Sequence, residues 1–342
     1  MRDLVLAIVT LALGLIAPAG AFEIEEERIF GAPQGRELSI ISTTDVPAIA
    51  PVMEAFVRHR PEARIRYMQA ASTEVFRAIH DEQAEIDLVM SSAMDLQMRL
   101  ANDGFAAPIS PEIDGLPDWA RWRDQLFGVA LEPVLTLASR RGLGDLAPPR
   151  TRRDLIAMLR EHPDRFDGRV ATYDPQSSGV GYFLISQDSS QSDSFWRLAE
   201  VMGRLNTRLY CCSGEMINDL RSGRITIAYN VVASYAARYA PDDPDLIRLA
   251  LEDYTFAIQR SALVPVNAPD PEYATEMLSF LLTPEAQAIM AESSGVALIP
   301  GTGPAASVHL RPVRLDAGLL VYGDQLRRGN LLAEWTAAMV QP

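Results

Sequence analysis

The sequence predicts an α/β protein with two lobes, each built on an open, mostly parallel sheet flanked by helices. A β-like run, a hydroxyl-rich turn and a helical run follow one another three times between residues 38 and 100. Similar units recur between residues 140 and 240, and two long β-rich segments cover 127–139 and 254–265. Repeated β-α units imply parallel, right-handed sheets, and a chain of this length is expected to divide into two lobes.

The first 21 residues have the pattern of a secretory signal peptide. Arg2 gives a charged start, residues 4–16 form an apolar core, and Ala19-Gly20-Ala21 is a small-residue cleavage pattern. Cleavage near Ala21 predicts a periplasmic protein of 342 − 21 = 321 residues, and an uncleaved anchor is the alternative. The following residues 22–35 are acidic and turn-rich, so we expect a loosely held N-terminal arm.

The charge and cysteine content exclude several classes of partner and site. Arg2 and Asp3 cancel, so the mature net charge stays at −14, which argues against nucleic acid and anionic membranes as partners. It does not forbid an anionic ligand, because local dipoles can outweigh net charge. The cysteines Cys211 and Cys212 are adjacent, so they provide neither a metal-ligand spacing nor a disulfide framework. We favour two buried thiols over a vicinal disulfide, and we expect no metal and no cofactor.

The first half of the chain predicts three strands whose ends carry hydroxyl groups. The expected strands are residues 38–41, 64–68 and 85–90, and each is followed by a helix. Asp45 can cap the first of these helices, with Pro47 in its first turn. Ligands of open parallel sheets bind beyond the carboxyl ends of the strands, where these turns gather.

The second half predicts another α/β unit and a return to the first. Thr151 is expected to cap a helix through residue 159, and residues 168–173 form a strand with a turn over 174–179. Helices are expected from Val180, over 195–205 with Trp196 facing inward, and over 215–222. A strand over 225–229 runs into Asn230 and a helix, and 271–290 forms one or two amphipathic helices.

These turns together predict a ligand site between the lobes. Hydroxyl groups and helix-start N–H groups are donors that suit phosphate or carboxylate oxygens. Any one of these residues is more simply explained as a helix cap or turn residue, but five strand ends together favour a site. Arg260 and Arg66 are candidate ligand cations, and Asp95 and Asp174 either accept hydrogen bonds from a ligand or cap helices. The candidate ligand-binding residues are Ser42, Thr43, Thr44, Ser72, Thr73, Ser91, Ser92, Tyr173, Ser177, Ser178, Gly179, Asn230 and Arg260.

Five segments resemble a known family. They are ISTTD (41–45), EIDLVMSSAMDLQMRLANDGF (85–105), YDPQSSGVGYF (173–183), SGRITIAYNVVASYA (222–236) and LTPEAQAIMAESSGVALIPG (282–301). The chain resembles a type II periplasmic solute-binding protein of ABC importers, in the branch of the ferric-ion-binding proteins. The resemblance covers nearly all of the mature chain and implies two α/β lobes joined by two hinge strands, with the ligand held between the lobes.

The repeated β-α units and the two long β-rich segments also predict domain boundaries. Lobe 1 is expected over 36–128 and 262–300, and lobe 2 over 138–250. The hinge strands are expected over 129–137 and 251–261, and a C-terminal extension over 301–342 is expected to pack on a lobe.

The sequence departs from the ferric-ion binders where they hold the metal. Those proteins use two adjacent tyrosines after the strand that matches residues 225–229, and the aligned positions here are Val231 and Val232. Ferric ion needs anionic oxygen ligands, which valine does not offer. The histidines are scattered and form no ligand motif. Ferric ion is therefore the alternative, and a small phosphate- or carboxylate-bearing anion is the predicted ligand.

Two other functions remain as alternatives. A secreted hydrolase is disfavoured, because no nucleophile elbow, HExxH, CxxC or P-loop motif occurs and no histidine neighbours a candidate serine. No catalytic residue is therefore assigned. A ligand-sensing subunit that docks on a membrane sensor kinase, instead of an ABC permease, cannot be separated by sequence. In either role we expect a monomer.

Overall fold

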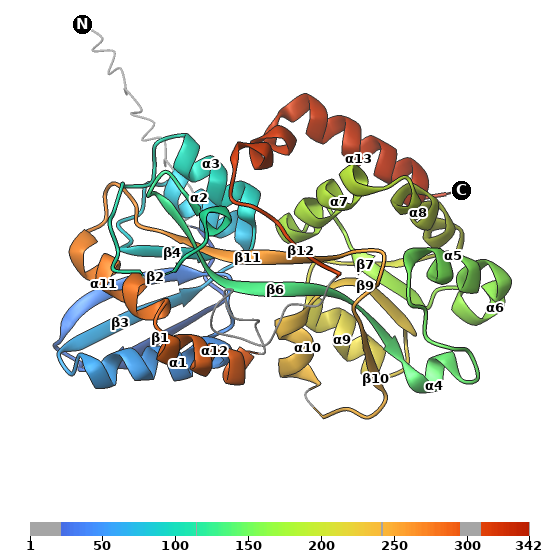
Figure 1. Ribbon diagram of the computed structural model, residues 1–342, viewed down its shortest axis with the longest axis horizontal. Helices are drawn as coiled ribbons and strands as arrows, with labels where there is room; N and C mark the ends of the chain where they lie inside the picture. The colour runs from blue at the N-terminus through green and yellow to red at the C-terminus, as the bar shows by residue number, and fades with distance from the viewer. Residues whose placement is uncertain (1–21, 114, 241, 295–308, 342) are drawn as a thin grey trace, which may run out of the picture.

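The computed structural model describes residues 22–113, 115–240, 242–294 and 309–341. Two groups of strands and helices lie on either side of two long strands, β6 (Leu126–Ser139) and β11 (Thr255–Leu263), which run between them (Figure 1). We call the group that contains the N-terminal strands lobe 1 and the other lobe 2. The expected signal peptide, and the glycine-bounded end of the 282–301 motif, lie outside the described residues.

Lobe 1 is a sheet covered by helices. Its strands are β1 (Glu26–Gly31), β2 (Arg36–Ser42), β3 (Ala63–Gln69) and β4 (Leu88–Ser91). Its helices are α1 (Val46–His59), α2 (Ser72–His80), α3 (Met94–Asn102), α11 (Pro271–Leu281) and α12 (Pro284–Ser294). The strand order is β1-β3-β2-β4-β11, and β2 pairs in parallel with both β3 and β4. The carboxyl ends of these three parallel strands therefore lie at one edge.

The predicted N-terminal arm is wrong in part, because residues 26–31 form an edge strand. β1 pairs antiparallel with β3 from Glu26 opposite Gln69 to Gly31 opposite Arg64. The acidic run suggested a solvated arm, but Phe30 is buried and packs in the lobe 1 core. An edge strand tolerates the exposed glutamates, since one of its faces meets solvent.

Lobe 2 repeats the architecture around a smaller sheet. Its strands are β7 (Val170–Tyr173), β8 (Arg208–Tyr210), β9 (Ile227–Val232) and β10 (Leu246–Leu249). Its helices are α4 (Arg140–Leu143), α5 (Arg152–Glu161), α6 (Pro163–Phe166), α7 (Gly179–Gln191), α8 (Ser194–Arg204), α9 (Ser213–Arg221) and α10 (Ala233–Tyr239). β7 pairs in parallel with β8 and β9. Thr151 caps α5 with a capping box, as its sequence predicted.

The two long strands connect the sheets of the lobes. The first half of β6 pairs with β11 and with the short β5 (Arg121–Trp122), which follows the 3-10 turn η1 (Asp118–Ala120). Its second half pairs with β9 and β10 in lobe 2. β6 and β11 are antiparallel neighbours, and they form the continuous connection between the lobes (Figure 1). The lobe and hinge boundaries given above stay a prediction.

The C-terminal segment contacts both lobes. It contains β12 (Leu310–Pro312), the 3-10 helix η2 (Ala317–Gly323) and α13 (Gln325–Met339). β12 pairs with β11, η2 packs on α3 of lobe 1, and α13 packs on α8 of lobe 2. The segment runs across the top of Figure 1 from one lobe to the other. The contacts are therefore broader than the packing on a single lobe that we expected.

In α8 of lobe 2, the aromatic side chain that faces the core is not the one that we expected. Phe195 is buried against the lobe 2 core, whereas Trp196, which we expected to face inward, is only half-buried at its edge. Adjacent residues on a helix point about 100° apart, so the two rings cannot both face the core. Trp335 of α13 is buried in the same cluster.

Candidate ligand-binding site

A small polar cavity lies where the two lobes and the hinge strands meet. Lobe 1 contributes the turn after β2, lobe 2 contributes α10, and β11 contributes an arginine. The cavity measures about 10 Å³ in this conformation, which is about what one water molecule needs. The lining residues are Thr44, Asp45, Ala48, Ser234, Tyr235, Arg238 and Arg260.

Arg260 is the central cation of this cavity. Its side chain projects from β11 and the residue is 4% exposed. Its Nη2 lies 2.6 Å from Oε1 of Glu132 on β6, and its Nη1 donates to the Thr44 hydroxyl. Burial acts to lower the pKa of the Arg260 guanidinium, but Glu132 and Tyr235 raise it, and the net pKa lies above its usual value. The Arg260 Nε has no acceptor among the described residues.

A second arginine links the lobes across the same cavity. Arg238 of α10 lies 3.4 Å from the carboxylate of Asp45, measured from Nε to Oδ2. Asp45 immediately precedes α1, but its side chain makes no cap hydrogen bond to that helix within the described part of the chain. The amide of Val46 instead donates to Oε1 of Gln69 at 2.9 Å. The carboxylate of Asp45 thus faces lobe 2 and not its own helix.

The hydroxyl-rich turns of lobe 1 lie together at the edge of the sheet. The Ser42 hydroxyl donates to Thr44 Oγ1 at 3.1 Å, and the hydroxyls of Thr43 and Ser92 lie 3.4 Å apart. The Ser91 hydroxyl accepts from the amide of Ala93 at 3.1 Å. Ser42, Thr44, Ser91 and Ser92 are buried. The turns after β2 and β4 therefore form one connected group, of which Thr44 reaches the cavity.

The starts of α2 and α7 meet across the gap between the lobes. A Cβ on Gly179 would lie 2.5 Å from the Ser72 hydroxyl oxygen, so the two turns are in close contact. Ser178 caps its own helix by accepting from Gly181 at 3.1 Å. Thr73 and Ser177 are exposed, and Ser177 donates to Asp174 at 3.1 Å. These predicted residues lie at the lobe contact but outside the lining of the cavity.

Two predicted residues point into lobe 2 instead. Tyr173 is buried and its hydroxyl bonds to that of Ser213, while burial raises its pKa to about 12. Asn230 has a φ of 64° and donates to Asp188 Oδ2 at 2.6 Å. Asp188 also accepts from Tyr229, Tyr254 and Arg152, so Asn230 belongs to a buried polar network behind the site.

The alternative charged candidates lie away from the cavity. Arg66 pairs with Glu27 at 2.8 Å on the exposed edge of the lobe 1 sheet. Asp174 accepts from the amide of Gln176 at 2.9 Å and closes its own turn. Asp95 is buried near the start of α3 and does not line the cavity.

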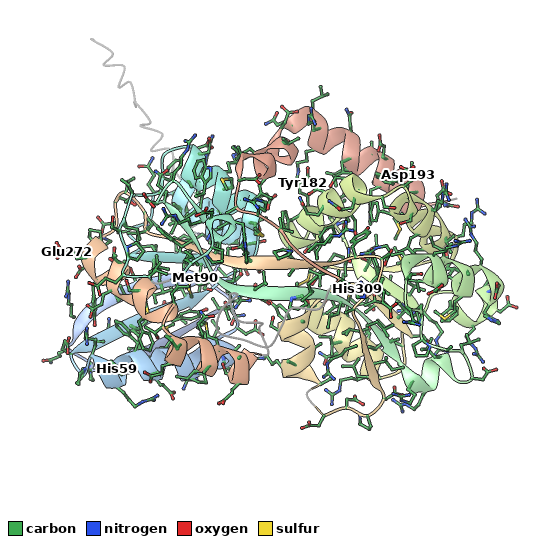
Figure 2. The ribbon with its side chains drawn as sticks, in the orientation of Figure 1. His59, Met90, Tyr182, Asp193, Glu272 and His309 are labelled. Carbon is green, nitrogen blue, oxygen red and sulfur yellow. A yellow bond between two sulfur atoms is a disulfide. The ribbon has the colours of Figure 1, made fainter. Side chains whose placement is uncertain are left out.

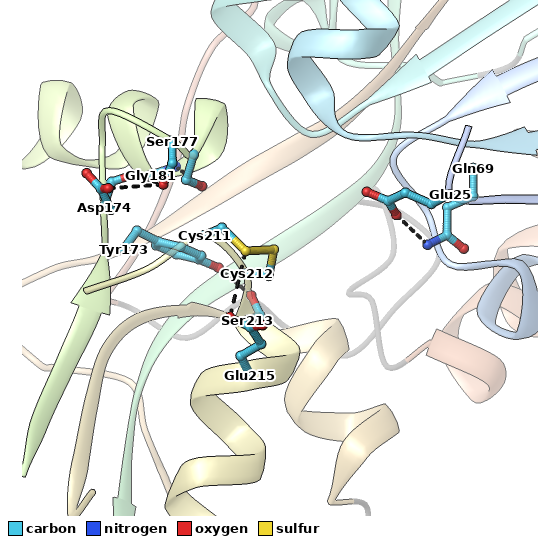
Figure 3. The surroundings of a disulfide bond; sticks show 11 residues. Glu25, Gln69, Tyr173, Asp174, Ser177, Gly181, Cys211, Cys212, Ser213 and Glu215 are labelled. Atoms are coloured by element: carbon cyan, nitrogen blue, oxygen red, sulfur yellow. Dashed lines mark hydrogen bonds between the residues drawn. A yellow bond between two sulfur atoms is a disulfide. The ribbon is translucent and has the colours of Figure 1, made fainter. Parts of the chain in front are cut away.

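The expectation of two buried thiols is wrong. Cys211 and Cys212 form a disulfide between adjacent residues, and both are exposed. They lie at the surface of lobe 2, on the short connection from β8 to α9. Figure 3 shows the disulfide on lobe 2 beside Tyr173 and Ser213, with Glu25 and Gln69 of lobe 1 at the other side of the view.

The sequence reading missed the contribution of α10. Ser234, Tyr235 and Arg238 lie on one face of a short helix, and Glu132 lies within an apolar strand. A charged residue inside a buried strand was the available indication for Glu132, because such a charge is rarely buried without a partner. For Arg238, which is an ordinary helix residue in sequence, no comparable indication exists.

Three observations on the described residues bear on ferric ion as a ligand. Val231 and Val232 are buried within β9 and supply no oxygen ligand. Burial raises the pKa of Tyr235, which opposes the phenolate form. No group of three His, Cys, Asp or Glu side chains in the described ranges could hold a metal. Figure 2 shows His59 at the outer side of lobe 1 and His309 near the crossing strands, so these two histidines are far apart.

Comparisons with known proteins agree with this architecture. Residues 40–295 match the family model of the bacterial extracellular solute-binding proteins. The substrate-binding protein of an ABC transporter from Agrobacterium tumefaciens is 30% identical, with a TM-score of 0.85 over 92% of this chain and 98% of that chain. No curated protein is significantly similar in sequence.

More distant structures share the fold. Iron-bound HitA from Pseudomonas aeruginosa is 15% identical, with a TM-score of 0.67 over 88% of this chain and 99% of that one. AfuA from Actinobacillus pleuropneumoniae with bound fructose-6-phosphate is also 15% identical, with a TM-score of 0.69 over 90% of this chain and 99% of that one. These likenesses show the fold, and it is the two-lobe fold that the sequence predicted.

The family is not enzymatic, and its members deliver small molecules to membrane permeases. Its extracellular designation implies a periplasmic location. Within the described residues, no helix has the length and apolar character needed to cross a membrane. By the match over most of its length and the likeness to the Agrobacterium protein, the chain belongs to the bacterial extracellular solute-binding proteins and is the solute-binding component of an ABC importer.

Proposed function

We propose that this protein captures a small phosphate- or carboxylate-bearing anion between its lobes and delivers it to the importer. The observation that carries the proposal is Arg260, a buried cation at the cavity with an Nε that has no acceptor among the described residues. A buried donor without an acceptor is costly, and an anionic oxygen would satisfy it. Arg238 adds a second positive charge at the same cavity.

The acidic surface does not oppose this proposal. Salt screens charges beyond about 8 Å, so the net charge of −14 acts weakly at the interior of the cleft. Hydrogen bonds from an arginine to a charged group contribute roughly 1.5–3 kcal/mol each. The cavity holds only about one water molecule in this conformation, so the lobes would part to admit a ligand. Because the cavity has donors from both lobes and from β11, the lobes would then close on the ligand through those donors.

The fold alone admits other ligands, since HitA holds iron and AfuA holds a sugar phosphate. Arg238 and Arg260 line the cavity and favour an anion. Val231 and Val232 stand in β9 where the ferric-ion binders have their tyrosines, and they disfavour ferric ion. The proposal includes export through the signal peptide expected over residues 1–21 and action as a monomer.

The test is a thermal-shift screen of the purified protein against phosphate, phosphorylated sugars, dicarboxylates, amines, neutral sugars and ferric citrate. We expect anions to raise the melting temperature, because a ligand that binds the folded state stabilises it. Stabilisation by a neutral sugar or an amine without any anion contradicts the proposal. So does a tyrosinate-to-iron absorption band at stoichiometric iron.

A variant pair locates the site. Arg260→Lys keeps the charge but removes the planar fork of donors, so we expect anion affinity to fall about tenfold or more. Arg36→Lys is the matched control, because Arg36 makes a similar two-point contact with Asp270 on the exposed face of lobe 1. If anion affinity falls equally in both variants, or falls in neither, the anion does not bind at Arg260.

A further inference from the structure

A buried carboxylate lies directly behind the cavity. Glu132 projects from β6, is fully buried, and contacts two residues that line the cavity. Its Oε2 accepts from the Ser234 hydroxyl at 2.5 Å, and its Oε1 lies 2.6 Å from Nη2 of Arg260. Glu132 therefore connects the hinge strand β6, the hinge strand β11 and α10.

The ion pair between Glu132 and Arg260 is incomplete on both sides. Oε1 of Glu132 is close to Nη2 but accepts no hydrogen bond of acceptable geometry among the described residues. Nε of Arg260 likewise donates to no described residue. A guanidinium presents Nε and Nη2 as a fork that binds a carboxylate or phosphate through two parallel bonds. Here Glu132 approaches Nη2 alone, so one buried donor and one buried acceptor are left beside each other.

We infer that the ligand carries both accepting oxygens and a hydrogen-bond donor, which Arg260 and Glu132 bind respectively. This inference rests on the proposed anion function and deepens it. Monohydrogen phosphate has this character, because its deprotonated oxygens accept while its P–OH group donates. A hydroxy acid has it too, through a carboxylate and a neighbouring hydroxyl. Sulfate and a plain dicarboxylate lack the donor at neutral pH.

Glu132 thereby discriminates between anions of similar size and charge. An anion without a donor would meet the carboxylate of Glu132 with an oxygen of like charge, and like charges in a buried site disfavour binding. Sites that form hydrogen bonds to a ligand hydroxyl reject analogues that lack it, because the buried polar group is then unpaired. Asp45 also lines the cavity, and its carboxylate would likewise repel an anion that lacks a hydrogen-bond donor.

The experiment is calorimetric titration of the full-length protein at pH 7.0 with two matched pairs of ligands. Phosphate is compared with sulfate, and malate with succinate. We expect the donor-bearing member of at least one pair to bind about tenfold tighter or more. In Glu132→Gln we expect that preference to fall below about threefold, because the amide donates as well as accepts.

Asp87→Asn is the matched control. Asp87 is a buried carboxylate of lobe 1 that accepts from the amide and hydroxyl of Ser39, so this change also removes a buried negative charge. We expect it to keep the wild-type preference. The wild-type comparison decides the inference even where Glu132→Gln does not fold.

The failures of the two proposals are distinguishable. If the wild-type protein binds both members of each pair equally, the inference is overturned while anion binding stands. A preference that persists in Glu132→Gln also overturns the role of Glu132. If none of the four anions, and no other anion of the thermal-shift screen, binds to wild type or variant, the proposed function is itself overturned.

Discussion

Asp95 shows how a single buried acid can make stability depend on pH. It is the second residue of α3 and is 7% exposed, and its Oδ1 has no donor among the described residues. Burial raises its pKa from 3.8 to about 6, although the amides of Leu96 and Asp95 and the charge of Arg328 act to lower it. The folded protein therefore binds this proton more tightly than the unfolded chain does.

The sign of the pH effect follows from this difference. The contribution of Asp95 to stability is fully present below pH 3.8 and is lost as the pH rises through about 6. We expect Asp95→Asn to raise the free energy of unfolding at pH 7.5 by up to roughly 3 kcal/mol, since the amide is neutral at every pH. The gain should vanish near pH 4. Urea unfolding of both proteins between pH 4 and pH 8 measures it, and a variant that is less stable than wild type at pH 7.5 refutes it.

Asp188 illustrates the opposite case, a buried acid whose oxygens are fully used. Its carboxylate accepts from Arg152 at 3.3 Å, Tyr229 at 2.9 Å, Tyr254 at 2.9 Å and Asn230 at 2.6 Å. We expect Asp188→Asn to cost about 3–5 kcal/mol, because Arg152 loses a buried counter-charge and the network loses acceptors. Denaturant unfolding followed by tryptophan fluorescence measures the loss. Asp145→Asn, which removes an exposed partner of Arg165, should leave the midpoint unchanged.

At the scale of elements, strands and helices with a clear apolar pattern were predictable. The runs that became β2, β3, β4, β6, β7, β9 and β11 are apolar and bounded by polar turns, and each lies within a few residues of its expected position. β8 and β10 were missed because they are short and half-exposed, so no alternation marks them. β1 was missed because its burial comes from one side chain, Phe30, in an acidic run.

The packing of α13 on α8 also lay beyond sequence reasoning, since it depends on close contact at one glycine. A Cβ on Gly203 would lie 2.2 Å from the carbonyl oxygen of Ala338, so the two helices touch through their backbones. We expect Gly203→Ala to separate them and to cost about 1–3 kcal/mol through overpacking. Gly329→Ala in α13 is the control, because a Cβ there meets open space.

The control variant, Gly329→Ala, should become more stable and not less. Alanine is a better helix former than glycine, so Gly329→Ala should stabilise the protein by up to about 1 kcal/mol. Melting curves of the two variants beside wild type provide the measurement. If Gly203→Ala melts at or above the wild-type temperature, α8 and α13 do not touch through their backbones at Gly203.

At the scale of the molecule, the site combines what was predictable with what was not. The turn after β2 and Arg260 were expected, because a strand followed by hydroxyls and an arginine in an otherwise apolar strand are visible in sequence. The contribution of α10 depends on how lobe 2 is placed against lobe 1, which no local pattern specifies. Tyr173 and Asn230 follow strand ends as expected, but their side chains turn toward Ser213 and Asp188.

Two of the contacts between the lobes lie at or near the candidate site. One is the ion pair between Asp45 and Arg238 beside the cavity, and the other is the contact between Ser72 and Gly179. In the second contact, Gly179 of lobe 2 faces only atoms of lobe 1 among its nearest neighbours. The three atoms nearest to a Cβ on Gly179 belong to Ser72 and Leu96, which are both in lobe 1, although Gly179 itself begins α7 of lobe 2. A side chain there would strike the opposite lobe first.

Gly179→Leu should therefore act as a wedge that opposes closure. A Cβ alone would lie 2.5 Å from Ser72 Oγ, 3.5 Å from Ser72 Cβ and 3.7 Å from Leu96 Cδ1, so a leucine side chain has no room while the lobes touch. We expect a larger radius of gyration in X-ray scattering and anion affinity weakened about tenfold or more, since the lobe contacts of the closed form cost energy to restore. Gln176→Leu, at an exposed position of the same turn, should change neither quantity. If Gly179→Leu scatters and binds like wild type, the contact between α2 and α7 is not part of the closed form that holds the ligand.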